Sequence, residues 1–412
     1  MSELIEKGIL AKNAARELAV LSTEKKNNAL LKMAQALIDN CDYIIEQNKI
    51  DLDNADIKPA MRDRLMLNKD RIKSMADGIR EVALLPDPIG EILSEVERPN
   101  GLLITKKRVP IGVIGIIYEA RPNVTSDASA LCLKSGNVAF LRGGSEAIMS
   151  NRAIVKVLSE SAKESGLPDG VINLVCDVSR ETANKMMKLN EYIDVLIPRG
   201  GKGLIKTVVE NSTVPVIETG SGVCHTYVSK SADLKMAESI VVNAKVSRPS
   251  VCNAMETLLI DKEIANEFLP LIKEKLIDLN VEVRGCEKCL EICPDLVSAT
   301  EEDWSTEYND YILSVKIVDG VDEAISHISR YSTKHSEAII TTDVMEADKF
   351  TSYIDSAAVY VNASTRFTDG NEFGLGAEIG ISTQKIHARG PMGLNELTSI
   401  KYVVKGNGQI RE

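Results

Sequence analysis

The chain has 412 residues, 44% of them hydrophobic and 26% charged, so it has the composition of a globular protein and exceeds the length at which one hydrophobic core keeps growing. Its formal charge of -11 at pH 7 excludes a general nucleic-acid binder, because such proteins need a basic surface to displace counterions from phosphates. The charged start lacks the apolar core of a signal peptide, and no run approaches the roughly 18 apolar residues of a membrane span, so we expect a cytoplasmic protein with no membrane partner.

Apolar residues at helical spacing dominate the first part of the chain, for example in LSTEKKNNALLKMAQALIDNCDYIIEQN. Ser22 and Thr23 stand at the start of this pattern, where a hydroxyl side chain caps a helix well. Pro86, Pro88 and Gly90 form a turn-rich stretch after it. We therefore expect a helical N-terminal region that ends near Gly90.

Short apolar runs alternate with helical stretches from Val109 onward. The runs are apolar on both faces, which is typical of strands in a parallel sheet covered by helices: VPIGVIGIIY, NVAFL, VINLV, IDVLIP and VPVIE. Thr125 or Ser126 is expected to cap the helix after the first run, and Ser145 the helix after the second. The pattern predicts a doubly wound domain, although the G-x-G-x-x-G fingerprint is absent.

A second α/β pattern begins after about residue 228. Its apolar runs METLLI, YILSVKIV, AIITT and AAVYVN alternate with helices that we expect over residues 233–245, 263–279, 321–331 and 344–354. The last apolar segment, LTSIKYVVKG, alternates as an exposed strand does. Two α/β domains are therefore expected.

Cys252 has the sequence context of a nucleophile. It follows a proline-containing turn after a helix and leads into an apolar strand, which places a thiol on a loop whose backbone N–H groups are free to face a ligand. A thiolate forms thioesters readily, and a thioester carbon accepts hydride, so this loop suits interconversion of acyl groups and aldehydes. Cys132 lies in the apolar stretch ALCLKSG and is expected to be a buried small hydrophobe instead.

Three other cysteines follow a C-x2-C-x3-C spacing, namely Cys286, Cys289 and Cys293. A structural zinc site needs four ligands, and no further cysteine or histidine lies close by in the sequence. We therefore expect free thiols here and no metal site.

Long motifs carry a resemblance to a known family. They are YEARPNVTSDASALCLKSGNVAFLRGGSEA, PRGGKGLI, GVCHTYV, RPSVCNAMETLL and VYVNASTRFTDGNEFGLGAEIGISTQKIHARGPMGLNELT. Residues 318–339 also match a signature, through His327, Tyr331, Ser332, Thr333, His335, Ser336 and Glu337. Over nearly its whole length the chain is similar to the gamma-glutamyl phosphate reductases of the aldehyde dehydrogenase superfamily.

The resemblance implies an α/β, aldehyde dehydrogenase-like fold with two parallel-sheet domains and a small oligomerisation element. On this basis residues 1–227 would bind the cofactor, residues 228–390 would form the catalytic domain, and a hairpin around residues 96–108 would join a C-terminal strand in 391–412 for homo-oligomerisation. That fold binds its cofactor without the usual glycine fingerprint. The implied activity is NADPH-dependent reduction of L-glutamate 5-phosphate to L-glutamate 5-semialdehyde through a Cys252 thioester, in proline biosynthesis, with a functional link to glutamate 5-kinase.

Site roles also follow from the resemblance. Asn123 would donate its amide to the oxyanion together with the backbone N–H of Cys252. Arg142 would bind the 2′-phosphate that distinguishes NADPH from NADH, because an arginine fork suits phosphate. The remaining cofactor-binding candidates are Gly143, Gly144, Gly200, Gly201 and Glu307, with Gly203 in the same loop, and the substrate-binding candidates are Arg121, Arg248 and Arg366.

The residues alone leave other functions and other roles for the candidate site residues open. A cysteine acyl hydrolase or acyltransferase would share Cys252 and Asn123 but would need no nicotinamide site. An aldehyde-oxidising dehydrogenase would need Glu218 as a general base, whereas a reductase that releases phosphate has no water to activate. Asn123 could also serve only a turn beside Pro122, and Arg142 could be a surface arginine.

Overall fold

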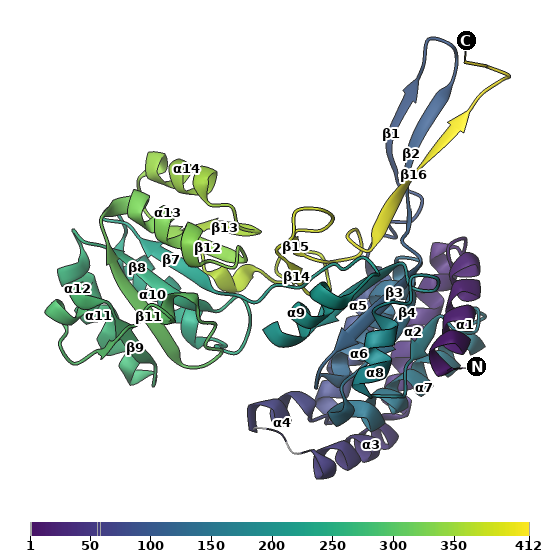
Figure 1. Ribbon diagram of the computed structural model, residues 1–412, viewed down its shortest axis with the longest axis horizontal. Coiled ribbons are helices and arrows are strands. Elements are labelled where there is room, and N and C mark those ends of the chain that lie inside the picture. The colour runs from purple at the N-terminus through teal and green to yellow at the C-terminus, as the bar shows by residue number, and fades with distance from the viewer. Residues whose placement is uncertain (1, 56, 58, 412) are drawn as a thin grey trace. The chain divides into compact units, whose positions relative to one another are not determined.

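The computed structural model describes residues 2–55, 57 and 59–411, which divide into two compact units (Figure 1). The first unit runs to Thr219 and also includes Gly374–Gly380 and the stretch from Met392 onward; the second contains Gly220–Phe373 and Ile381–Pro391. The expected boundary at residue 227 would cut strand β7 (Cys224–Val228), which pairs with two strands of the second unit and therefore belongs there.

The N-terminal region of the first unit is helical, as predicted. Its helices are α1 (Glu3–Leu18), α2 (Thr23–Asp39), α3 (Cys41–Asn54), α4 (Pro59–Leu65) and α5 (Lys69–Leu84). Ser22 caps α2 by accepting a hydrogen bond from the backbone N–H of Lys25, which confirms the predicted start. Within the described ranges, every helix is too short or too polar to cross a bilayer.

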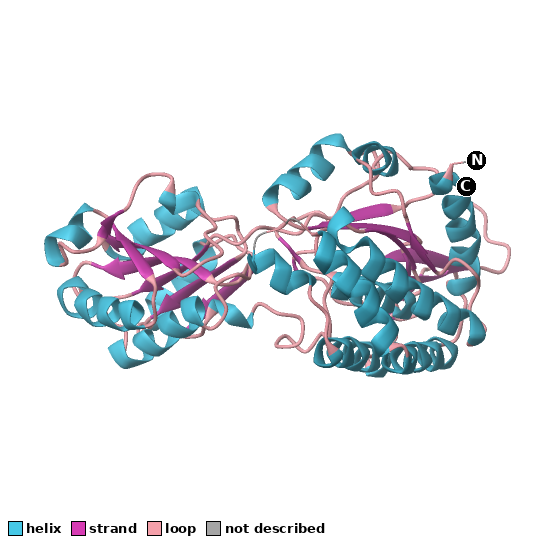
Figure 2. Cartoon of the chain, turned by 90° about the horizontal axis from the view of Figure 1, so that it is seen from below, coloured by secondary structure: helices cyan, strands magenta, loops and turns pink. Residues whose placement is uncertain are grey.

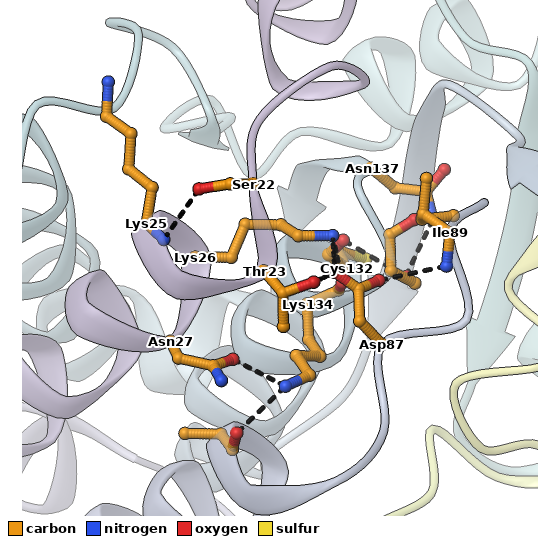
Figure 3. Close-up of polar contacts among 12 residues, drawn as sticks. Ser22, Thr23, Lys25, Lys26, Asn27, Asp87, Ile89, Cys132, Lys134 and Asn137 are labelled. Carbon is orange, nitrogen blue, oxygen red and sulfur yellow. Dashed lines mark hydrogen bonds and ion pairs between the residues drawn. The ribbon is translucent and has the colours of Figure 1, made fainter.

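Two lysines are buried in this region, where α2 meets the turn after α5 (Figure 3). Lys26 Nζ lies 2.6 Å from Asp87 Oδ2 and donates to the carbonyl of Lys134 at 3.0 Å. Lys134 Nζ in turn donates to Asn27 Oδ1 at 2.5 Å and to the carbonyl of Ala83 at 2.9 Å. Burial lowers the pKa of Lys134, and the Asp87 carboxylate opposes that shift. Because an unpaired buried charge is costly, this network anchors the Pro86–Gly90 turn to the helices.

The first unit contains a four-stranded parallel sheet of order β5-β4-β3-β6. Its strands are β3 (Val113–Tyr118), β4 (Val138–Arg142), β5 (Ile172–Leu174) and β6 (Val195–Arg199), joined by α6 (Pro122–Lys134), η1 (Ser145–Ala147), α7 (Ile148–Glu164) and α8 (Arg180–Met186), with α9 (Lys202–Asn211) after β6. Helices cover both faces of the strands in this unit and in the second (Figure 2). The strands run in the same direction, so the segments that follow β3, β4 and β6 lie at one edge of the sheet.

Three local expectations for this unit are wrong. The run VPVIE forms no strand: only Val216 bridges Leu196, and Pro215 has no N–H with which to extend the ladder. Helix α6 begins at Pro122 rather than at Thr125 or Ser126, because proline is favoured in the first helical turn. Ser145 starts a 3-10 turn, and the following helix α7 begins three residues later.

The second unit contains a seven-stranded parallel sheet of order β10-β9-β11-β8-β7-β12-β13. The remaining strands and helices, in chain order, are α10 (Leu234–Val246), β8 (Met255–Asp261), α11 (Ala265–Asp278), β9 (Glu282–Gly285), α12 (Glu287–Ile292), β10 (Val297–Ser298), η2 (Asp303–Ser305), β11 (Ile312–Val318), α13 (Gly320–Tyr331), β12 (Ser336–Ile340), α14 (Val344–Tyr353), β13 (Ala358–Val361), η3 (Thr365–Phe367), β14 (Ile381–Ser382) and β15 (Gly390–Pro391).

Side chains of this sheet alternate between two cores. Leu258 packs with α10, α11 and α12, whereas Leu259 packs with α13 and α14 on the other face. The predicted helices and the strands METLLI and YILSVKIV are confirmed to within two residues. Strands β7 and β9 were not predicted.

A three-stranded antiparallel sheet joins the hairpin β1 (Ile92–Glu97) and β2 (Leu103–Pro110) to the C-terminal strand β16 (Thr398–Lys405). Strand β16 is exposed, as predicted, and its apolar residues Ile400, Tyr402 and Val404 are each more than 40% exposed. They alternate along the strand and therefore share one face.

Candidate active site

Cys252 lies on the loop between α10 and β8 and is partly buried. Because Cys224 pairs with Met255 and His225 pairs with Glu337, the amino ends of β7, β8 and β12 lie side by side at one edge of the sheet. The loop that carries Cys252 therefore borders the segments that lead into the other two strands.

The backbone of Cys252 is held by Cys224, whose S–H donates to the Cys252 carbonyl at an Sγ–O distance of 3.2 Å. Cys224 is fully buried. Burial, and next the negative charge of Glu337, raise the pKa of the Cys224 thiol well above its usual range. Cys224 therefore stays protonated as a donor, and Cys252 is the accessible thiol of the two.

Gly222 allows this close approach. A Cβ atom at position 222 would lie 1.5 Å from the carbonyl oxygen of Cys252, so a larger residue cannot occupy the position unless the loop moves. Two hydrogen bonds hold the same segment: the Gly222 N–H donates to Glu307 Oε1 at 2.8 Å, and the Val223 N–H donates to Thr333 Oγ1 at 3.0 Å. Glu307 thus supports the loop that supports Cys252.

Asn253, the residue after the thiol, is buried and tied to η3. The side-chain Nδ2 of Asn253 donates to the backbone carbonyls of Arg366 at 3.2 Å and Thr368 at 2.9 Å. The backbone carbonyl of Asn253 accepts from Thr365 Oγ1 at 2.8 Å. The Arg366 guanidinium also donates to Asn253 Oδ1. These contacts fix the loop on the C-terminal side of Cys252.

Two arginines place positive charge beside the thiol. Arg248 is exposed, and Arg366 is partly buried with its Nε 3.0 Å from Ser247 Oγ. The pKa of Arg366 is lowered, first by burial and then by the charge of Arg248, while Asp369 and Cys252 oppose the shift. Arg248 and Cys252 therefore both lie close enough to Arg366 to affect its charge.

Asn123 lies in the first turn of α6 in the other unit and is exposed. Its Nδ2 donates to Asp127 Oδ2 at 3.0 Å, one helical turn later. Burial raises the pKa of Asp127 to about 6, against the hydrogen bonds from Asn123 and Ser126. Since a side-chain amide has two N–H donors, this contact orients Asn123 and leaves its second donor able to bind a ligand.

Arg142 ends β4, and its Nη2 donates to the carbonyls of Val178 at 2.5 Å and Ser179 at 3.3 Å. Among the described residues its buried Nε has no partner. Burial lowers the pKa of Arg142, and the carboxylates of Glu146 and Asp177 oppose that shift.

The two glycines after Arg142 lie close to polar side chains of the first unit. A Cβ at Gly143 would lie 2.1 Å from Asn151 Nδ2, and one at Gly144 would lie 2.3 Å from Glu146 Oε1. Both contacts are with the ends of flexible side chains, which can move, so they do not by themselves require glycine at either position.

Gly200 and Gly201 follow β6 beside the end of β3, where the strand order reverses. In doubly wound sheets ligands bind in the crevice at such a point. The Gly201 N–H donates to Glu119 Oε2 at 2.9 Å, and a Cβ at Gly203 would meet no described atom within 4 Å. The cofactor-binding role expected for this loop stays a prediction.

The sequence profile of the aldehyde dehydrogenase family matches residues 6–304 of the chain. A gamma-glutamyl phosphate reductase from Clostridium botulinum (strain Alaska E43 / Type E3) is 61% identical over 414 residues, with 100% of both chains covered. The chain belongs to the gamma-glutamyl phosphate reductases of the aldehyde dehydrogenase family. It is accordingly an oxidoreductase, and the family resemblance and fold class inferred from sequence are confirmed.

Solved structures of gamma-glutamyl phosphate reductases share the fold. The enzyme from Thermotoga maritima superposes with a TM-score of 0.97 at 52% identity, with 100% of both chains covered. The enzyme from Saccharomyces cerevisiae has a TM-score of 0.55 at 30% identity, with 100% of this chain and 99% of that chain covered. An acetylating aldehyde dehydrogenase from Geobacillus thermoglucosidasius shares the fold at 18% identity, with a TM-score of 0.72 and coverage of 100% and 98%.

The residues of the gamma-glutamyl phosphate reductase signature bind the start of β12 to β7. Glu337 accepts from the backbone N–H of His225 at 2.8 Å, from its ring Nδ1 at 3.1 Å, and from the hydroxyl of Ser332. His327 packs edge to face on His225 with 5.6 Å between ring centroids, and burial holds its pKa well below the usual range. These histidines are buried parts of the scaffold.

The structure brings together some of the residues expected to act in a gamma-glutamyl phosphate reductase. Cys252, Arg248, Arg366 and Glu307 gather in the second unit. Arg121, Asn123, Arg142, Gly143, Gly144, Gly200 and Gly201 follow the ends of β3, β4 and β6 in the first. Sequence reasoning did not single out Gly222, Cys224 or Asn253 as site residues, and it placed Thr333 only within the family signature. The small-residue segment GSG before β7 was a sequence signal of a close approach.

Proposed function

We propose that the chain reduces L-glutamate 5-phosphate to L-glutamate 5-semialdehyde with NADPH and releases phosphate, a step of proline biosynthesis. The observation that carries this proposal is the Cys252 loop, because the thiol on this loop lies beside two arginines. The chain also belongs to the gamma-glutamyl phosphate reductases. An acyl phosphate bears the dianionic leaving group that such a site favours.

In the proposed chemistry the Cys252 thiolate attacks the acyl carbon of the substrate, and the bond to the phosphate oxygen breaks, so a thioester forms and phosphate leaves. The backbone N–H of Cys252 and the amide of Asn123 stabilise the oxyanion that precedes the thioester. Arg248 and Arg366 bind the phosphate or the α-carboxylate, and Arg121 is a third candidate.

A nicotinamide cofactor, when bound, would supply the hydride that reduces the acyl carbon. Residues proposed to hold it are Arg142, Gly143, Gly144, Gly200, Gly201 and Glu307. Reduction of the thioester carbon would release the Cys252 thiolate as the leaving group, so no general base for water would be needed. Glu218 consequently has no step in this mechanism.

A coupled assay tests the function directly. Glutamate 5-kinase, ATP and glutamate generate L-glutamate 5-phosphate in the assay mixture. We expect no oxidation of NADPH when the kinase, ATP or glutamate is left out. In the reverse direction, reduction of NADP+ by the semialdehyde should require phosphate. Phosphate-independent oxidation would indicate an aldehyde-oxidising dehydrogenase, and glutamate release without NADPH would indicate a hydrolase; either result would contradict the proposal.

Arg142→Ala is expected to weaken NADPH binding by about 10- to 100-fold, since a charge-assisted bond to phosphate contributes roughly 1.5 to 3 kcal/mol. NADH binding should change little, because NADH lacks the 2′-phosphate. Fluorescence titration with both cofactors measures the difference. Arg180→Ala, an exposed arginine at the start of the nearby helix α8, is the matched control. Equal losses for both cofactors would show that Arg142 does not read the 2′-phosphate.

Homo-oligomerisation through the three-stranded sheet is also proposed, because Ile400, Tyr402 and Val404 form an exposed apolar row on β16. Changing Tyr402→Lys together with Val404→Lys should reduce the particle to a monomer in light scattering. Ser399→Lys, on the opposite face of the strand, should not change the size. A double variant of unchanged size would remove this interface from consideration.

A further inference from the structure

Two cysteine thiols that the proposed mechanism does not use lie in contact in the second unit. Cys286 is the residue before α12 and is partly exposed, and Cys289 lies inside that helix and is fully buried. Their sulfur atoms are 3.6 Å apart. Cys293, at the end of the same helix, is buried in the core beside them.

The backbone holds this pair in a geometry that suits a disulfide. The Cys289 N–H donates to the Cys286 carbonyl at 2.8 Å, so the two residues share one turn. A disulfide has an S–S distance of about 2 Å, so the sulfur atoms, now 3.6 Å apart, need only a small adjustment of the turn to form the bond. Among the described residues, no three His, Cys, Asp or Glu side chains are arranged to hold a metal ion.

The two thiols differ in exposure and in the direction of their pKa shifts. A hydrogen bond from Cys289 and backbone N–H groups lower the pKa of Cys286, although burial opposes the shift. The same hydrogen bond and burial raise the pKa of Cys289. An accessible thiolate beside a buried thiol is the arrangement in which one sulfur attacks and the other resolves.

We propose that Cys286 and Cys289 form a reversible redox pair that low-molecular-weight disulfides oxidise to an intramolecular disulfide. The Cys286 thiolate attacks one sulfur of the small disulfide, whose S–S bond breaks and releases one thiolate. Cys289 then loses its proton, attacks Cys286 Sγ and displaces the second thiolate. Two protein thiols are oxidised and one small disulfide is reduced to two thiols, and Cys252 takes no part.

Peptide mapping of the full-length protein tests the pair. The protein is equilibrated with mixtures of reduced and oxidised glutathione, quenched with acid, alkylated and digested with trypsin. Because trypsin cleaves after Arg284, Lys288 and Lys316, a Cys286–Cys289 bond joins peptide 285–288 to peptide 289–316. A Cys289–Cys293 bond would instead stay within peptide 289–316. We expect the joined peptides in wild type and in Cys293→Ser, while Cys41, whose pKa is raised by burial, remains alkylated.

Three variants test the roles assigned to the two thiols. Cys289→Ser should accumulate glutathione on peptide 285–288, because the resolving thiol is gone, and Cys286→Ser should take up none in this segment. In reduced Cys289→Ala, alkylation of Cys286 should require a higher pH than in wild type, because the hydrogen bond that lowers its pKa is lost. A bond confined to peptide 289–316, stable glutathione on wild-type Cys286, or full alkylation in the most oxidising mixture would each overturn the proposal. A Cys286–Cys293 bond would join the same two peptides, so fragmentation of the joined wild-type peptides must show that Cys293 carries the alkyl group; this measurement decides the question even if a variant does not fold.

Discussion

Cys252→Ser is expected to abolish acyl phosphate reduction, with a loss on the order of 10⁴-fold or more, as for other covalent nucleophiles. The substitution keeps nearly the same shape but replaces a thiol that is partly ionised near neutral pH with a hydroxyl that is barely ionised there. Phosphate-dependent oxidation of the semialdehyde should disappear in the same variant, and NADPH binding should remain. The coupled assay and a fluorescence titration measure these properties separately.

Cys132→Ser is the control for this experiment. Cys132 is fully buried in α6, and burial raises its pKa, so its replacement should leave the chemistry intact even if the protein loses some stability. Substantial turnover by Cys252→Ser in either direction would exclude the thioester mechanism. A loss of NADPH binding in that variant would point to misfolding instead, which circular dichroism would reveal.

Gly222→Ala is expected to lower the rate of the chemical step by roughly 100-fold or more, because a displacement of about 1 Å at a reacting centre has an effect of that order. The added Cβ would overlap the carbonyl oxygen of Cys252 at 1.5 Å, so the loop must shift. The S–H of Cys224 would then lose its acceptor. NADPH binding should be retained, so single-turnover kinetics are the appropriate measurement.

Gly78→Ala provides the matched control. Gly78 lies in α5, and an added Cβ there meets no described atom within 4 Å outside its own helix, so a near-neutral or slightly stabilising effect is expected. A Gly222→Ala enzyme with an unchanged rate would show that the loop can shift without cost, and that Gly222 is not a positioning residue for Cys252.

Local signals in the sequence were sufficient for much of this protein. The alternation of apolar runs and helices predicted both parallel-sheet units, and Ser22 predicted the start of α2. The turn before an apolar strand made Cys252 the candidate nucleophile, and that role stays a prediction. Periodicity, caps and turns depend on neighbours within a few residues, so they can be read without the fold. The long motifs also identified the family, which the comparisons confirmed.

Local signals failed where a strand or a side chain depends on partners distant in the chain. VPVIE has the apolar composition of a strand but makes a single bridge, whereas β7 is short and begins with a cysteine and a histidine yet lies inside the seven-stranded sheet. The surroundings of Cys252 depend on Gly222, 30 positions before it, and on Arg366, which reaches Asn253 across 113 positions. Gly222, Cys252 and Asn253 come together because the order of the parallel strands decides which strand ends share an edge of the sheet.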